Sequence, residues 1–101
     1  MNKMRRQELM ALAHEVEKVQ ETDDVYEVIN TLENIKYDEE YYYDNIPENL
    51  QYSQRAYDSE AAIDNMEQAL HALNDILDLK TNKTMQDLLN TAIEYINEAR
   101  Y

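Results

Sequence analysis

The chain has 101 residues and a formal net charge of -13, and it contains no glycine, no cysteine and a single proline. Without glycine it lacks the phosphate-cradling loops and tight catalytic turns of many enzymes, and without cysteine it has no disulfide, thiolate metal site or cysteine nucleophile. The charge opposes direct binding to nucleic acid or to an anionic membrane, so the composition favours one helical, acidic binding module over an enzyme.

The N-terminal segment predicts a helix over about residues 3–20. Its apolar residues recur at spacings of three and four, which places them on one helical face. They are Leu9, Leu12, Val16 and Val19. The segment has no apolar run long enough for a signal peptide or a membrane span, and we expect a cytoplasmic protein.

A second helix is predicted over about residues 24–44. Its apolar face comprises Val25, Val28, Ile29, Leu32 and Ile35. At about 100° per residue, this face would point almost opposite to the first one if a single helix continued. Either the chain breaks near residues 21–24, where Asp24 and Glu27 could form a capping box, or one long helix meets different partners along its length. We favour the break.

A loop is predicted over residues 45–53 around Pro47. Proline cannot continue a helix and forces the preceding Ile46 out of helical geometry, so the second helix must end near Asn45. We expect Ile46 and Leu50 to tuck into the core and anchor this loop.

Two further helices are predicted over about residues 56–79 and 84–100, with a break at residues 80–83. Ser53 and Thr84 are the expected N-caps, and Asp87 stands in capping-box position after Thr84. The apolar face of the third helix comprises Ile63, Met66, Leu70, Leu73 and Leu77, widened on one side by Ala62, Ala69 and Ile76. The face of the last comprises Met85, Leu88, Leu89, Ala92, Ile93, Ile96 and Ala99.

Together these segments predict an all-α fold in a single domain, an antiparallel helical hairpin or bundle of three to four helices. The expected core comprises Leu9, Leu12, Val16, Val19, Ile29, Leu32, Ile35, Ile63, Met66, Leu70, Leu73, Leu77, Leu89, Ile93 and Ile96. So small a bundle is marginally stable as a monomer. We therefore expect self-association into a homodimer or a larger oligomer.

One block of the sequence resembles a known family. The block comprises DNIPENLQ at residues 44–51, then Ser53 and Arg55, then EAAIDNME at residues 60–67, together with Met1-Asn2-Lys3 and Arg5-Arg6 at the start. It is similar to a family of small acidic helical proteins encoded by phages and other mobile elements of Gram-positive bacteria. The resemblance, which covers roughly residues 38–79 and the first few residues, implies a helical hairpin and a bacterial host cell. It implies no activity.

Side chains suited to catalysis or metal binding are sparse. The chain has two histidines, His14 and His71, and no glycine with which to build a nucleophile elbow. Glu67 and Asp75 share a helical face with His71 and could hold a divalent ion, but the Glu-x-x-His spacing of di-iron bundles is not matched. We predict surface histidines, no enzyme, no catalytic residue, no metal and no cofactor.

Most of the nine tyrosines lie between residues 37 and 57. Tyr37 and Tyr41, one helical turn apart, could close one end of the bundle. Alternatively the cluster, including Tyr42, Tyr43 and Tyr52, makes an interface, for which tyrosine is suited because it joins a large apolar ring to a polar tip. Three consecutive tyrosines at 41–43 cannot all face one core, so at least one should reach solvent or a partner.

The distribution of acidic residues is the most informative feature. Lys36 is the one lysine or arginine among residues 19–54, and residues 56–79 contain none. One narrow stripe on the predicted third helix, called here the acidic stripe, comprises Glu60, Asp64, Glu67, Asp75 and Asp78. Carboxylates one turn apart are about 5–6 Å from each other, which is comparable to the spacing of phosphates along a nucleic-acid strand.

Two functions are consistent with these features. In the first, a non-enzymatic inhibitor mimics nucleic acid and docks on a basic, nucleic-acid-binding host protein, such as a defence nuclease of the CRISPR-effector type or a regulator. In the second, an oligomeric helical scaffold, adaptor or small-ligand sponge carries acids only for solubility. The expected partner-binding residues are Glu60, Asp64, Glu67, Asp75, Asp78, Asp38, Glu39, Glu40, Asp44, Tyr42, Tyr43 and Tyr52.

Overall fold

A computed structural model describes residues 1–78 and 84–101 of the chain. In these ranges the chain forms four α-helices and one short 3₁₀ helix, without any β-strand, so the predicted all-α class is confirmed. The elements are α1 (Lys3–Glu17), α2 (Thr22–Asp44), η1 (Glu48–Leu50), α3 (Gln54–Asp78) and α4 (Met85–Ala99). The predicted helix end at residue 79 and the predicted break over residues 80–83 lie outside the described residues.

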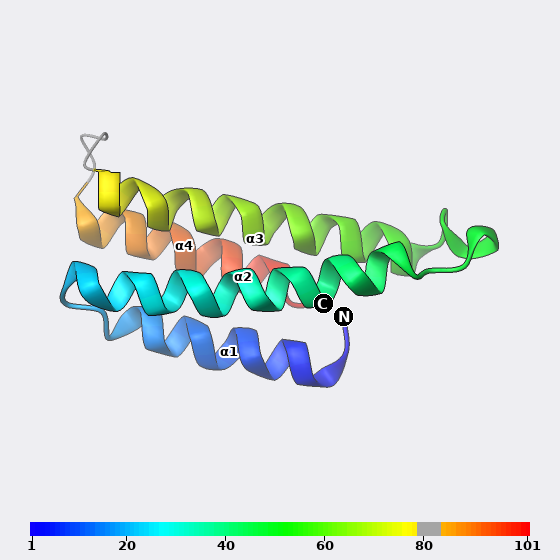
Figure 1. The fold of residues 1–101 in the computed structure, drawn as a ribbon, viewed down its shortest axis with the longest axis horizontal. Helices are drawn as coiled ribbons and strands as arrows, with labels where there is room; N and C mark the ends of the chain where they lie inside the picture. The colour runs from blue at the N-terminus through cyan, green and yellow to red at the C-terminus, as the bar shows by residue number, and fades with distance from the viewer. Residues whose placement is uncertain (79–83) are drawn as a thin grey trace.

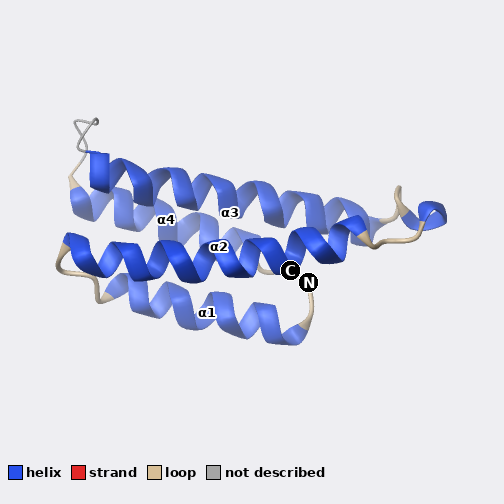
Figure 2. Cartoon of the chain, in the orientation of Figure 1, coloured by secondary structure: helices blue, strands red, loops and turns tan. Residues whose placement is uncertain are grey.

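The four helices lie lengthwise beside one another in a molecule that measures 45 × 24 × 17 Å (Figure 1). α1 contacts α2, α2 contacts α3, α3 contacts α4, and α4 also contacts α1, so the helices enclose one shared core. α2 and α3 have 23 and 25 residues against 15 each in α1 and α4. Their joined ends therefore project beyond the other two helices, as Figure 2 shows. Residues 41–57, which include this projection, are called the hairpin tip below.

The break between the first two helices is confirmed. α1 ends at Glu17 and α2 begins at Thr22, and the turn between them lets Val16 and Val25, from the two opposed faces, both reach the core with 0 % exposure. The predicted cap at Asp24 is wrong. α2 begins two residues earlier, so Asp24 lies inside the first helical turn, where its carboxylate interacts favourably with the positive end of the helix dipole.

The other helix starts follow the capping rule. Thr84 Oγ1 accepts a hydrogen bond from the Asp87 N–H at 3.1 Å, and Ser53 Oγ accepts one from the Ala56 N–H at 3.3 Å, as predicted. Asn2, which was not predicted as a cap, accepts a hydrogen bond from the Arg5 N–H at 2.8 Å. All three caps satisfy backbone donors that have no partner within their own helix.

The loop around Pro47 is correctly placed, but only one of its two expected anchors is buried. α2 ends at Asp44, and Ile46 is 8 % exposed. Leu50 is 37 % exposed, so its expected burial is wrong. η1 lies at the end of the hairpin tip, beyond the reach of α1 and α4 (Figure 1), and no core is within reach of Leu50 there.

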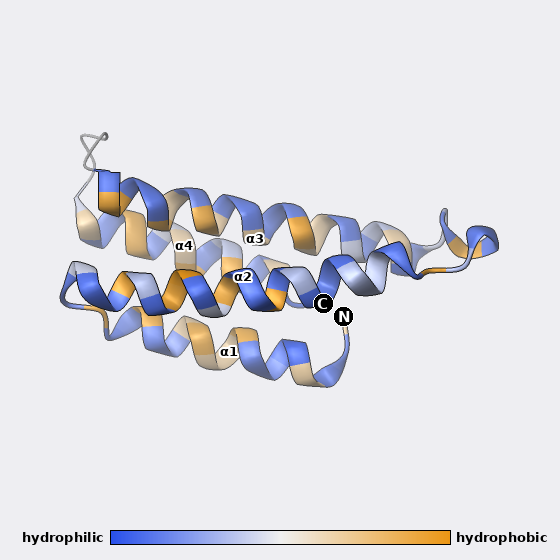
Figure 3. Cartoon of the chain, viewed as in Figure 1, coloured by the Kyte–Doolittle hydropathy of each residue, from blue (hydrophilic) through white to orange (hydrophobic). Residues whose placement is uncertain are grey.

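The core follows the predicted apolar faces, which appear as orange bands along the helices in Figure 3. Most of the predicted core residues are buried, whereas Val19, Ile63, Leu77 and Ile93 are half-buried. On α3, which contacts both α2 and α4, the buried face is centred on Ala62, Met66, Ala69, Leu73 and Ile76. This shift follows from residue size, because alanines let two helix backbones approach closely.

Candidate binding surfaces

The acidic stripe lies on the outer side of α3. All five of its residues are exposed, while Met66 and Leu73 on the opposite side of the same helix are fully buried. Lys36 of α2 approaches the stripe, with its Nζ 3.5 Å from a carboxylate oxygen of Glu67 and 3.5 Å from one of Glu40. The stripe therefore borders α2, and this one lysine reduces the repulsion near its middle.

The four acids of α2 expected at the partner surface do not share one environment. Asp38 and Asp44 are exposed and Glu40 is half-buried, whereas Glu39 is 0 % exposed. The prediction that Glu39 binds a partner is therefore wrong. Glu39 follows Leu32 and Ile35 on the buried face of α2, at spacings of seven and four residues, and this face points into the core.

The buried carboxylate of Glu39 is the centre of a hydrogen-bond network, called here the Glu39 network. The Arg5 Nε donates to Oε1 at 2.8 Å, and the hydroxyls of Ser59 and Tyr101 donate to Oε2 at 2.5 Å and 2.6 Å. A buried carboxylate needs both a counter-charge and hydrogen-bond donors, and here it has both. The network joins α1, α2, α3 and the segment after α4.

Arginines hold the two ends of the chain at this network. The Arg6 Nη1 donates to the carbonyl oxygens of Met1 at 2.8 Å and of Tyr101 at 3.0 Å. The Arg5 guanidinium lies over the ring of Tyr42, 5.4 Å from its centroid. Tyr42 is half-buried as a result, and part of the ring that was expected to meet a partner instead packs within the molecule.

The titration of Tyr101 gives the network a pH signature. Burial, and then the hydrogen bond that its hydroxyl donates to Glu39, raise the pKa of Tyr101 above its ordinary value of 10.0. The folded state therefore favours the neutral phenol. Its contribution to stability is complete below about pH 10, the pKa of an unperturbed tyrosine, and is lost as the pH rises above that value.

We expect the urea midpoint of the protein, followed by circular dichroism, to fall as the pH rises above about 10, because Tyr101 then ionises in the unfolded state. Tyr101→Phe should be less stable at neutral pH, by about 1 kcal/mol for the lost hydrogen bond, and should show a shallower decline above pH 10. The control is Tyr52→Phe, at an 84 % exposed position, which should keep the wild-type slope. Equal slopes for all three proteins would contradict this account.

The tyrosines gather at the hairpin tip, and several are open to solvent. Tyr41 and Tyr52 are 74 % and 84 % exposed, so at least one of Tyr41–Tyr43 does reach solvent, as predicted. Tyr37 is 61 % exposed, and the interpretation that Tyr37 and Tyr41 close the bundle is wrong. The buried side chains near this end include those of Glu39, Ser59 and Ile46.

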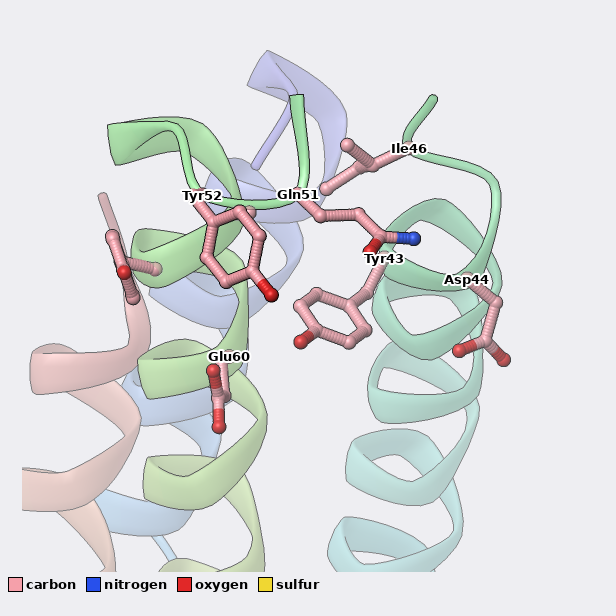
Figure 4. A pocket seen from close by; sticks show the side chains of 8 residues that line it. Tyr43, Asp44, Ile46, Gln51, Tyr52 and Glu60 are labelled. Atoms are coloured by element: carbon pink, nitrogen blue, oxygen red, sulfur yellow. The ribbon is translucent and has the colours of Figure 1, made fainter. Parts of the chain in front are cut away.

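An open pocket of about 370 Å³ lies between α2 and α3 at the tip. Three tyrosines and two acids contribute to its wall, and the buried Ile46 contributes to its apolar part; the aromatic and acidic residues are Tyr43, Tyr52, Tyr57, Asp44 and Glu60. The hydroxyls of Tyr43 and Tyr52 point into the space between the helices, and the carboxylate of Glu60 lies near them (Figure 4). Sequence reasoning missed this pocket because it depends on which residues of α2 and α3 lie opposite each other.

The histidines lie on the surface. Both are exposed, and His14 Nδ1 is 3.7 Å from a carboxylate oxygen of Glu17. Across residues 1–78 and 84–101, no three histidine, aspartate or glutamate side chains are grouped so that they could hold a metal ion. His71, Glu67 and Asp75 therefore share a helical face without forming such a group.

Comparison of the chain with protein-family models, with curated protein sequences and with solved structures gave no significant match in any of the three. Among the described helices, none combines the length and the apolar character needed to cross a membrane. Function is therefore inferred from two surfaces of the molecule itself, the acidic stripe and the hairpin tip.

Proposed function

We propose that this protein is a non-enzymatic inhibitor whose acidic stripe docks on the basic cleft of a nucleic-acid-binding protein and competes there with nucleic acid. The observation that supports this most is the row of five exposed carboxylates on one long helix. From Glu60 to Asp78 the row extends about 27 Å, at about 1.5 Å per residue. This length is enough to follow a strand-binding groove over several phosphates.

The setting of the stripe favours recognition over mere solubility. α3 is held against the core along its whole buried face, from Ala56 to Ile76, so the carboxylates are presented at fixed spacings and are not free to spread apart. Like charges one turn apart destabilise a helix, and α3 contains no lysine or arginine beyond Arg55 in its first turn to offset them. This arrangement lowers the stability of the helix, but because the carboxylates are already held in place, less conformational entropy is lost on docking. Such a surface is suited to binding a cationic partner.

The resemblance to proteins of phages and mobile elements sets the context of this proposal. The partner would be a basic protein of the bacterial host cell, such as a defence nuclease of the CRISPR-effector type or a transcription regulator. Association would be fast and would weaken as salt is added, because electrostatic attraction governs the encounter.

A second candidate function is an oligomeric scaffold or adaptor in which an antiparallel bundle self-associates through its tyrosines. The observation that favours it is the exposure of large aromatic rings at the hairpin tip, with Tyr41 and Tyr52 the most exposed. In this case changing Tyr42, Tyr43 and Tyr52 to alanine would reduce the mass measured by light scattering, and salt would have little effect.

The test neutralises the stripe with Glu60→Gln, Asp64→Asn, Glu67→Gln, Asp75→Asn and Asp78→Asn in one variant. The wild type, immobilised, should retain nucleic-acid-binding proteins from a bacterial lysate at low salt, release them at high salt or on addition of DNA, and inhibit a retained nuclease after its purification. The variant should lose affinity about 100-fold or more, since it removes five charges from one docking face. Its fold, checked by circular dichroism, should persist.

The matched control makes the same change in charge on another part of the surface. Glu15, Glu17, Glu21, Asp23 and Glu27 are all exposed and lie outside the stripe. Their neutralisation should leave affinity for the purified partner within a fewfold of the wild type. If the control loses as much affinity as the stripe variant, net charge alone attracts the partner, and mimicry by the stripe is wrong.

A further inference from the structure

The pocket at the hairpin tip has an unusual balance of charge. Eight residues line it. Two of them, Asp44 and Glu60, are acids, and none of the eight is a lysine or an arginine. On the other side of the tip, a second pocket is lined by Arg5 and Arg55 together with Asp38, so its wall carries both signs of charge. Of these two pockets, the first is therefore the one whose wall favours a cation.

The polar atoms of the first pocket are mostly hydrogen-bond acceptors. The hydroxyl oxygen of Tyr43 points into it from α2, and that of Tyr52 points into it from the turn just before α3 (Figure 4). The Glu60 carboxylate lies on the α3 side, and the side-chain amide of Gln51 lies across its upper end. Carboxylate, amide and hydroxyl oxygens accept hydrogen bonds from N–H groups, and tyrosine rings attract a cation to their faces. The fitting ligand is therefore a cation that also carries several N–H donors.

We propose that this pocket binds the guanidinium group of an arginine side chain presented by a protein partner. A guanidinium is planar, always charged and carries five N–H donors, so it can lie against a tyrosine ring while it donates to Glu60 and to the hydroxyls. A quaternary ammonium has the charge but no donor, and a lysine ammonium has no planar face.

This inference rests on the proposed function and makes it more specific. Glu60 belongs both to the pocket and to the acidic stripe, so the pocket is the end of the stripe at the hairpin tip. An arginine held there would fix where a basic cleft begins along α3, and the remaining carboxylates would then face its other cations. The pocket thus sets where the partner docks along α3, and the stripe provides the electrostatic attraction.

The experiment is a titration of the whole protein with the capped peptide acetyl-Ala-Arg-Ala-amide, followed through the NMR signals of the tyrosine rings. We expect saturable shifts at Tyr43 and Tyr52, with a dissociation constant in the millimolar range. The same peptide with citrulline in place of arginine keeps the shape and loses the charge, and it should bind at least about tenfold more weakly. Tetramethylammonium, which has no N–H donor, should not displace the arginine peptide.

Two single variants test the wall of the pocket, and two matched controls accompany them. Glu60→Gln and Tyr52→Ala should each weaken peptide binding about tenfold, and both residues are exposed, so the fold should persist. The controls are Glu67→Gln, in the same stripe, and Tyr26→Ala, at a 57 % exposed tyrosine elsewhere on α2, and neither should change the affinity.

Several results would overturn this assignment: no saturable binding, equal binding of the citrulline peptide, displacement by tetramethylammonium, or equal losses in Glu67→Gln and Glu60→Gln. The titration contains no partner protein, so its outcome is separate from that of the stripe test. If the peptide does not bind but the stripe variant does lose affinity for its partner, the arginine site is rejected and docking by the stripe is retained. Peptide binding that succeeds while the stripe variant keeps its partner rejects docking by the stripe. Because that variant also carries Glu60→Gln, the same result shows that this partner does not use the pocket.

Discussion

Glu39→Ala is expected to lower the free energy of unfolding by about 3 kcal/mol, the lower end of the cost of removing one partner of a buried ion pair. The change would leave the Arg5 guanidinium, whose side chain is 12 % exposed, without its counter-charge, and would leave the hydroxyls of Ser59 and Tyr101 without their acceptor. Urea unfolding followed by circular dichroism at neutral pH measures the effect.

The control for this variant is the neighbouring residue. Glu40→Ala removes a carboxylate that lies 3.5 Å from Lys36 and is partly exposed, so it should cost less than about 1 kcal/mol. The double variant Glu39→Met with Arg5→Met should recover part of the loss, because no buried charge is then left alone. If Glu39→Ala unfolds at the same urea concentration as Glu40→Ala, the carboxylate is not buried as described.

Leu73→Ala should cost about 2–5 kcal/mol, the range for truncating a leucine in a packed core. Leu73 is 0 % exposed at the centre of the buried face of α3, and its loss would leave a cavity that the surrounding helices can only partly close. In a protein of this size the melting temperature should fall by roughly 10 °C or more.

Leu50→Ala is the same chemical change at a position that is 37 % exposed on the hairpin tip. It should alter stability by no more than about 0.5 kcal/mol. A large loss at Leu50 would restore the original expectation that this leucine anchors the loop, and a small loss at Leu73 would mean that α3 is turned differently about its axis.

The helices themselves could be predicted from local rules. Periodic apolar residues, the caps Ser53 and Thr84, and the restriction imposed by Pro47 act within a few residues of each other, and each led to an element close to the observed one. The opposed apolar faces before and after residue 20 also predicted a break, because a single helix cannot turn both toward one core.

The details that depend on neighbouring helices could not be predicted in the same way. Sequence spacing placed the centre of the α3 face among Ile63, Leu70 and Leu77, but in the folded bundle, where α3 contacts both α2 and α4, the side that carries Ala62 and Ala69 is the buried one. Likewise Leu50 is apolar and yet has no core within reach, because the hairpin tip extends past α1 and α4.

The spacing of Glu39 from the apolar residues of α2 indicates that it is buried, although a charged residue is ordinarily expected on the surface. Glu39 continues the spacing of Leu32 and Ile35 on α2, and Ser59 precedes Ala62 and Met66 on the inner face of α3. A carboxylate and a hydroxyl that both interrupt apolar faces indicate a buried polar pair. The third and fourth members, Arg5 and Tyr101, come from distant parts of the chain, and no local pattern joins them.

The Glu39 network also has a consequence for how the helices are aligned along their axes. Apolar faces built from repeating leucines, isoleucines and alanines can slide past each other by one turn, about 5.4 Å, with little loss of burial. A single carboxylate that must meet donors from α1 and α3 together is satisfied in one alignment only. A slip of α2 by one turn would also move Tyr43 away from Tyr52 and Glu60, so the same carboxylate that prevents slippage keeps the pocket assembled.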